Sequence, residues 1–147
     1  MNKKKRMVAW ALLIFWMSLI FYMSNQPADI SDGQSDLVIK LFSYIGIELN
    51  NYFGNLASFI VRKGAHFTEY LILYLLAYNL NKNYFDRKAK LYSIIFVFLY
   101  ACSDEIHQFF IPGREMHIRD VIIDTLGGLF GYLIIFIKSK INYNYKH

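Results

Sequence analysis

The sequence contains only one cysteine, Cys102, which lies inside an apolar run. A lone cysteine forms no disulfide within its chain, so we interpret it as a small buried hydrophobic residue that gives no information about the redox compartment. The net charge is +5, but the basic residues stand in short clusters beside apolar runs, without a basic groove or base-stacking motif. This pattern argues against nucleic acid as a partner. The chain also lacks internal repeats and low-complexity tracts.

Apolar residues dominate the composition. Hydrophobic residues make up 56% of the chain and aromatic residues 18%, which is rich for a water-soluble domain of this size. A spanning helix needs roughly 20 apolar residues, because the hydrocarbon core is about 30 Å thick and each helical residue rises about 1.5 Å. Four segments meet this requirement: residues 7–23, 62–80, 91–110 and 118–137. The sequence therefore predicts a single all-α domain, residues 1–147, that is a polytopic membrane protein with four transmembrane helices.

The first apolar segment follows a basic run, residues 3–6, which is a pattern that also opens secretory signal peptides. Its apolar stretch is long for a signal-peptide core. The segment that follows has no small-x-small cleavage site, because Gln26 stands three positions before any cut after Ala28. We therefore expect a retained membrane anchor.

The basic residues between the apolar segments predict the orientation. Lysine and arginine in short connections are retained on the cytoplasmic side. They cluster in three places, which are residues 3–6, the connection with Lys82, Arg87, Lys88 and Lys90, and the tail with Lys138, Lys140 and Lys146. These places fall on one side of a four-span protein, so both termini are predicted to be cytoplasmic. Residues 24–61 and the short connection around residues 112–114 are then outside.

The long outer loop contains a helical pattern of its own. Apolar residues recur at helical spacing at Leu37, Val38, Leu41, Phe42 and Ile45. This spacing predicts a short amphipathic helix that lies in the membrane surface. A soluble cap packed over the helix bundle is the alternative, and both remain open at this point.

Ionisable and polar side chains gather at the outer ends of the last three predicted spans. Such groups are costly within a membrane and call for a partner, a cavity or a function. Helical spacing places neighbours three or four positions apart on one face. The side chains that share faces in this way are His66 with Glu69, Asp104 with His107 and Gln108, and Asp120 with Asp124.

Depth along the helices brings these groups into one layer. Glu69 and Asp124 each lie roughly 10 Å below the outer start of their spans, and Asp104 lies within about two turns of that level. Simpler interpretations exist for single residues. An arginine such as Arg62 or Arg114 can snorkel to lipid phosphates, and a lone histidine is more often a satisfied core residue than a catalyst. These interpretations explain the whole set poorly, because each unpaired member is unfavourable in hydrocarbon.

Glycines mark two further features. The face of the last span continues through Gly127, Gly128 and Gly131, which predicts close approach of a neighbouring helix. In the outer connection, Pro112-Gly113 precedes Arg114. Glycine permits a tight backbone turn and proline limits its freedom, so this pair is expected to fix the direction of the arginine side chain.

Several motifs in this order resemble those of the VanZ-like family of small bacterial membrane proteins. The resemblance covers most of the chain and implies a four-helix domain in the bacterial plasma membrane. The name-giving member of the family is linked to tolerance of the glycopeptide antibiotic teicoplanin, but the family supplies no established reaction. The matching segments are Ser24-Asn25-Gln26-Pro27, Arg62-Lys63-x-x-His66-Phe67-x-Glu69-Tyr70, Asp104-Glu105-x-His107-Gln108-x-Phe110-x-Pro112-Gly113-Arg114 and Asp120-x-x-x-Asp124-x-x-Gly127.

Two functions fit this outer polar site. One is a hydrolase or transferase that acts on a lipid-linked or cell-envelope anionic substrate by acid–base chemistry. The other is a non-enzymatic binder of a cell-wall precursor or lipid. The candidate catalytic residues are His66, Glu69, Asp104, Glu105, His107 and Asp124, and the candidate substrate-binding residues are Arg62, Lys63, Gln108, Arg114, Asp120, Ser24 and Gln26.

Two other possibilities are less favoured. A proton-coupled transporter fits poorly, because the cytoplasmic halves of the spans are apolar and offer no pathway. Histidine and carboxylate ligands would also allow a divalent metal. No HExxH or other established catalytic spacing is present, so the sequence alone does not favour a metal cofactor.

Overall fold

The computed structural model describes residues 2–85 and 88–144, and these residues are almost entirely helical. The predicted all-α fold is confirmed, and no strand occurs in the described part of the chain. Arg87 and Lys146, two of the basic residues used to predict the orientation, lie outside the described residues. The elements in chain order are α1 (Lys3–Ser24), α2 (Ala28–Tyr44), α3 (Leu49–Phe53), a 3-10 turn η1 (Gly54–Leu56), α4 (Ala57–Asn81), α5 (Ala89–Gln108) and α6 (Ile118–Asn144).

The four predicted spans correspond to α1, α4, α5 and α6. Helix α4 begins at Ala57, earlier than predicted, and α6 continues to Asn144. Within the described residues, two helices are long and apolar enough to cross a membrane, namely α1 and residues 118–142 of α6. Helices α4 and α5 do not meet that standard.

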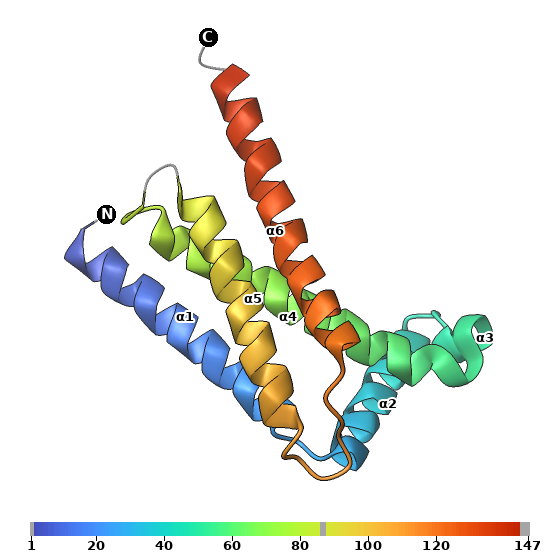
Figure 1. The fold of residues 1–147 in the computed structure, drawn as a ribbon. Helices are drawn as coiled ribbons and strands as arrows, with labels where there is room; N and C mark the ends of the chain where they lie inside the picture. Colours follow the sequence, from blue (N-terminus) through green and yellow to red (C-terminus); the bar gives the residue numbers. More distant parts are fainter. Residues whose placement is uncertain (1, 86–87, 145–147) are drawn as a thin grey trace.

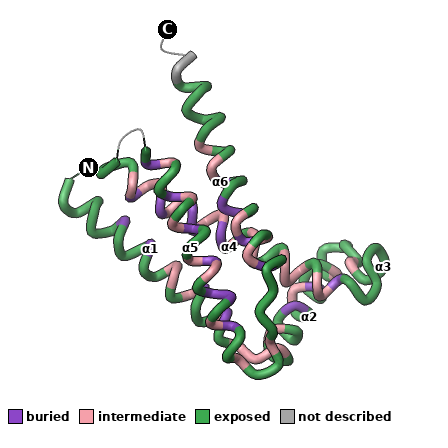
Figure 2. The backbone as a smooth tube through the Cα atoms, in the orientation of Figure 1, coloured by how far each residue is buried: buried purple, intermediate pink, exposed green. Residues whose placement is uncertain are grey.

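Helix α4 is the centre of the bundle and contacts α1, α2, α5 and α6. Tyr70, Leu73 and Tyr74 of α4 are fully buried, and they pack in one core with Ile20 of α1 and Val97 of α5. Figure 2 shows the buried positions along the lines where these helices meet. The large apolar residues of α4 therefore hold the other helices around it.

Glycine allows α6 to lie directly against α4. A Cβ added at Gly127 would stand 2.1 Å from the backbone oxygen of Phe67, and one at Gly131 would stand 2.8 Å from the ring of Tyr74. A Cβ at Gly128 would meet the α5 side chain of Val97 at 2.7 Å. The predicted close approach along this face is confirmed.

Helix α2 occupies the segment where a short helix was predicted, but it is longer and starts directly after Pro27. It packs against α4, with Ser35 and Ile39 buried. Leu37 and Leu41, on the apolar face that the sequence indicated, remain exposed. The helix therefore packs on the bundle and also presents an apolar face to its surroundings.

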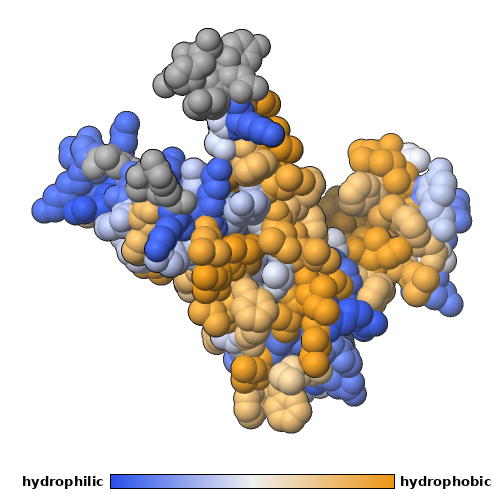
Figure 3. Space-filling view, turned by 45° about the horizontal axis from the view of Figure 1, so that its top comes forward, coloured by the Kyte–Doolittle hydropathy of each residue, from blue (hydrophilic) through white to orange (hydrophobic). Residues whose placement is uncertain are grey.

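The outer surface of the bundle is apolar. Phe15 of α1, Leu99 of α5 and Ile122 of α6 are 64%, 60% and 53% exposed. In Figure 3 the hydrophobic colour covers the middle of the molecule, and hydrophilic residues gather toward its edges. An apolar surface of this extent is characteristic of a protein region that contacts lipid or another protein.

The helix ends are arranged in two groups. Figure 1 shows the start of α1, the end of α4 and the start of α5 together toward one end, and α6 runs in the same direction toward the C-terminus. The last residues of α1 and α5 and the first residues of α6 lie toward the opposite end, near the start of α2. The polar ends of α5 and α6 therefore meet there.

Candidate functional site

Three helices bring a histidine and two aspartates together. His66 of α4, Asp104 of α5 and Asp124 of α6 each offer a donor atom, and these atoms lie within 4.8 Å of one another. The Nδ1 atom of His66 is 3.7 Å from Oδ1 of Asp124 and 3.9 Å from Oε2 of Glu69. Four of the candidate residues therefore form one cluster, which we call the His66 cluster.

Several polar atoms of the His66 cluster lack a hydrogen bond. Both carboxylate oxygens of Asp124 and the Nδ1 atom of His66 are buried without a partner among the described residues. Only 1% of the surface of Asp124 is exposed. Buried polar groups are normally paired, so unpaired ones at this position require an explanation.

A series of hydrogen bonds connects Asp104 to the connection between α5 and α6. The side-chain amide of Gln108 donates to Asp104 at 3.3 Å, and Arg114 donates through Nη1 to Oε1 of Gln108 at 3.1 Å. The Nε of Arg114 donates to the backbone oxygen of Gln26 at 2.9 Å. Gln26 thus takes part in this series of hydrogen bonds through its backbone oxygen. Its own side chain bonds the backbone of α1.

The turn before Arg114 has the predicted form. Gly113 has a φ of 75°, a conformation that glycine adopts without the strain that other residues meet. In the described residues, Arg114 lies within salt-bridge distance of no carboxylate. Burial lowers the pKa of its guanidinium, as expected for a cation that is removed from water without a direct counter-ion.

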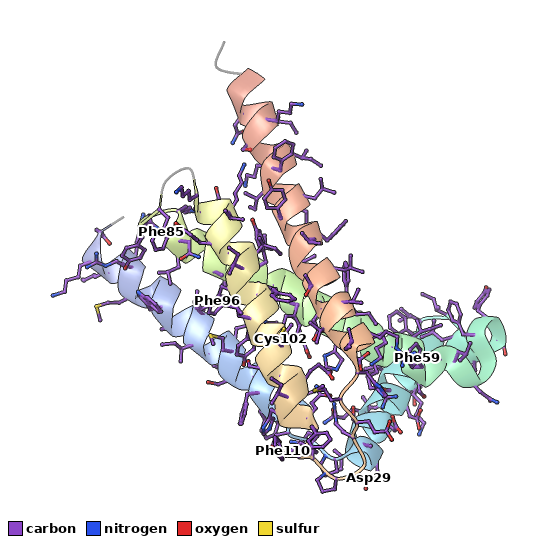
Figure 4. The ribbon with its side chains drawn as sticks, viewed as in Figure 1. Asp29, Phe59, Phe85, Phe96, Cys102 and Phe110 are labelled. Atoms are coloured by element: carbon purple, nitrogen blue, oxygen red, sulfur yellow. The ribbon has the colours of Figure 1, made fainter. Side chains whose placement is uncertain are left out.

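Two ion pairs flank the His66 cluster. Lys63 Nζ is 2.6 Å from Oδ2 of Asp120, and Arg62 Nη1 is 2.6 Å from Oδ1 of Asp32. The ring of Phe59 lies 5.5 Å from Lys63 Nζ and 5.4 Å from the guanidinium of Arg119. Figure 4 shows Phe59 where α4 passes the start of α6 and the upper part of α2.

Two cavities meet at these side chains. The smaller has a volume of about 110 Å³ and lies between α2 and α4, with Glu69 in its wall. The larger has a volume of about 300 Å³ and is lined by Lys63, Arg119 and Asp120 among others. Both cavities are also lined by Arg62, His66 and Arg114.

A family model described as VanZ/LLP1 matches residues 9–139. The chain belongs to the VanZ/LLP1 family. The match contains every motif on which the resemblance was based, and together with the apolar α1 and α6 it identifies a membrane protein. No curated protein and no solved structure matches the chain.

Three further candidate residues of this VanZ-like protein, Ser24, Glu105 and His107, line neither of the two cavities. The Nε2 atom of His107 lies 3.1 Å from Oδ1 of Asn25, and the His107 ring stacks on Phe21 with centroids 4.6 Å apart. Glu105 accepts a hydrogen bond from the backbone N–H of His117 at 2.9 Å. Ser24 is buried, and its hydroxyl has no partner within residues 2–85 and 88–144.

Sequence reasoning missed two partners. Asp32, in the predicted outer loop, was not among the candidate residues, yet it binds Arg62. Asn25 lies inside a quoted motif of the VanZ-like family, but its contact with His107 was not foreseen. The acidic charge of the loop could have suggested the first contact. The second depends on the rotation of α1 against α5, for which the sequence carries no signal.

Proposed function

We propose that this VanZ-like protein binds the anionic head group of a lipid-linked or cell-envelope molecule at the outer leaflet. The observation that carries the proposal is the composition of the larger cavity. Four cationic side chains line it, from Arg62, Lys63, Arg114 and Arg119, against two acidic ones, from Glu115 and Asp120. A phosphate or carboxylate in this cavity would meet an excess of positive charge.

The proposal includes a topology in which α1, α4, α5 and α6 all span the membrane and both termini are cytoplasmic. The positions of the basic residues and the grouping of the helix ends support it. In a Cys102→Ala background, Asp29→Cys should react with a membrane-impermeant thiol reagent on intact cells, and Lys88→Cys should react only after lysis. The reverse pattern would place the cavity on the cytoplasmic side and contradict the proposal.

Arg114 is the residue that we expect to hold the head group. Its Nε and one Nη are fixed by Gln26 and Gln108, so the planar guanidinium has a set direction at the wall of both cavities. A guanidinium can hold a phosphate or carboxylate with two parallel hydrogen bonds, whereas a lysine ammonium is a compact charge. A merely snorkelling arginine would tolerate replacement by lysine.

The experiment compares the Arg114→Lys variant with wild type. Both proteins are purified in a neutral detergent, and binding of phosphatidylglycerol and of a polyprenyl diphosphate is measured separately, with phosphatidylcholine as the uncharged reference. We expect wild type to prefer an anionic lipid and Arg114→Lys to bind it at least about tenfold more weakly, which corresponds to about 1.4 kcal/mol. The two anionic probes distinguish a membrane lipid from a cell-wall lipid carrier.

The control is Arg6→Lys, because Arg6 is exposed near the opposite end of α1. This variant should bind as wild type does, and both variants should retain the thermal unfolding temperature of wild type. Equal affinity of Arg114→Lys and wild type would assign Arg114 to structure and remove the main support for the proposal.

A second candidate function, a hydrolase or transferase, is favoured by one observation. His66 lines both cavities, and its buried Nδ1 has no hydrogen bond although carboxylates lie 3.7 and 3.9 Å away. A histidine oriented by carboxylates can serve as a general acid or base. If the protein affects teicoplanin tolerance, His66→Ala should abolish that phenotype while the protein stays folded. Full tolerance in this variant would exclude the enzymatic alternative.

A further inference from the structure

Three donor atoms of the His66 cluster, one from each of three helices, lie close together. They lie within 4.8 Å of one another, on His66, Asp104 and Asp124. Asp124 and Asp104 are 1% and 4% exposed. Two carboxylates are therefore held away from bulk solvent beside one imidazole, at a position to which α4, α5 and α6 each contribute one side chain.

The charge of this group is not compensated within the described part of the chain. No lysine or arginine there lies within salt-bridge distance of Asp124, and both of its oxygens lack a hydrogen bond, as does Nδ1 of His66. Lys63 and Arg62 stand nearby, but each is 2.6 Å from a different carboxylate. A buried carboxylate without a partner is strongly unfavourable, so Asp124 must either take up a proton or bind a cation from outside the chain.

We propose that His66, Asp104 and Asp124 bind a divalent transition-metal ion. A dication offsets two carboxylate charges and occupies the unpaired donor atoms. The imidazole favours an ion such as Zn²⁺ over Mg²⁺ or Ca²⁺, which prefer oxygen ligands. Sites with three protein ligands keep a fourth position open for water or substrate. Ligand atoms about 2.0–2.1 Å from a tetrahedral ion stand about 3.3 Å apart, so no pair of donor atoms needs to close by more than about 1.5 Å on binding.

Outer partners already orient one of the ligands. Gln108 donates to Asp104 and is itself held by Arg114, and such supporting hydrogen bonds are typical of metal-ligating side chains. His66 also lines the cavity proposed for the head group. The ion would therefore stand beside a bound anion, a placement that rests on the proposed function. Metal binding itself does not depend on it.

The test measures the metal content and the stability of the purified protein. Full-length protein without an affinity tag is stripped with a chelator in detergent, loaded with Zn²⁺ and desalted, and its metal content is measured by mass spectrometry. We expect about one Zn²⁺ per chain and a rise in the thermal unfolding temperature on loading. Mg²⁺ at the same concentration should give neither result.

Matched variants localise the ion. Asp124→Asn and Asp104→Asn keep the size of the side chain and should each reduce bound Zn²⁺ at least tenfold and remove the rise in unfolding temperature. The control is Glu115→Gln, because Glu115 and its neighbour His117 form an exposed acid–histidine pair, 3.6 Å apart, that could bind zinc adventitiously. This control should bind as much Zn²⁺ as wild type does.

Three results would overturn the metal site. They are a wild type that retains no Zn²⁺, wild-type Zn²⁺ content in both aspartate variants, and equal stabilisation by Mg²⁺. Failure of the metal site is distinguishable from failure of the proposed function. A protein without zinc that still binds anionic lipid through Arg114 would keep the head-group proposal and lose only the ion.

Discussion

Asp120 and Asp124 lie one turn apart on α6, yet their surroundings differ. Asp120 accepts from Lys63 at 2.6 Å, and the charge of its carboxylate is compensated. Asp124 is more deeply buried and has no hydrogen bond to any described residue. Its neighbour is His66 Nδ1 at 3.7 Å. The same residue type on the same helix is thus paired at one position and unpaired at the next.

This difference separates structure from function at the end of the bundle where the cavities lie. A paired buried charge supports the fold only while its partner is present, because loss of one partner leaves the other uncompensated. An unpaired buried charge lowers stability in the absence of a ligand. We therefore infer that Asp120 holds α4 against α6 and that Asp124 binds the proposed metal ion.

The largest expected effect comes from Gly127→Ala, which should push α6 away from α4. Both Asp120 and Asp124 of α6 would then lose their neighbours on α4. The added Cβ would stand 2.1 Å from the backbone oxygen of Phe67, and backbone cannot move aside as a side chain can. We expect a loss of at least about 3 kcal/mol of unfolding free energy, the upper end of ordinary overpacking costs. Denaturant titration in detergent micelles would measure it.

Gly64→Ala is the matched control for that substitution. Gly64 is also helical, but an added Cβ meets nothing within 4 Å. Alanine is favoured over glycine inside a helix by roughly 0.5–1 kcal/mol, so this variant should be at least as stable as wild type. Similar losses in both variants would show that α4 and α6 are not in close contact at Gly127.

A smaller effect is expected from His107→Ala, because His107, unlike His66, lies outside the His66 cluster. His107 contacts Asn25 and stacks on Phe21, so its removal should cost about 1 kcal/mol of stability. Lipid binding and Zn²⁺ content should remain those of wild type, because His107 lines neither cavity. Loss of either property in a folded His107→Ala protein would place this histidine in the site.

The helices could be predicted from the sequence because their signal is local. Four apolar segments predicted α1, α4, α5 and α6, and glycine spacing predicted the face of α6 that approaches its neighbours. The polar residues of the VanZ-like motifs identified the end of the bundle where the cavities lie. These inferences need only the period of a helix and the preference of apolar residues for lipid.

The pairing of the polar side chains could not be predicted from the sequence. Asp120 and Lys63 were both candidate residues, but their ion pair was not predicted. His66 and His107 both have carboxylates at helical spacing, yet only His66 faces Asp124. Such choices depend on the rotation of each helix about its axis and on the distances between helices. Packing of the whole bundle sets both quantities.

The most direct test of the account compares Asp120→Asn with Asp124→Asn in the presence of a chelator. Asparagine keeps the shape of the side chain and removes its charge, so the difference between the variants reports the pairing of each carboxylate. We predict that Asp120→Asn lowers the unfolding free energy by about 3 kcal/mol, because Lys63 loses its counter-ion. We also predict that Asp124→Asn is as stable as wild type or more stable, because Asp124 has no partner to lose and its burial is unfavourable. Equal destabilisation of both variants would contradict the account and make Asp124 a structural residue.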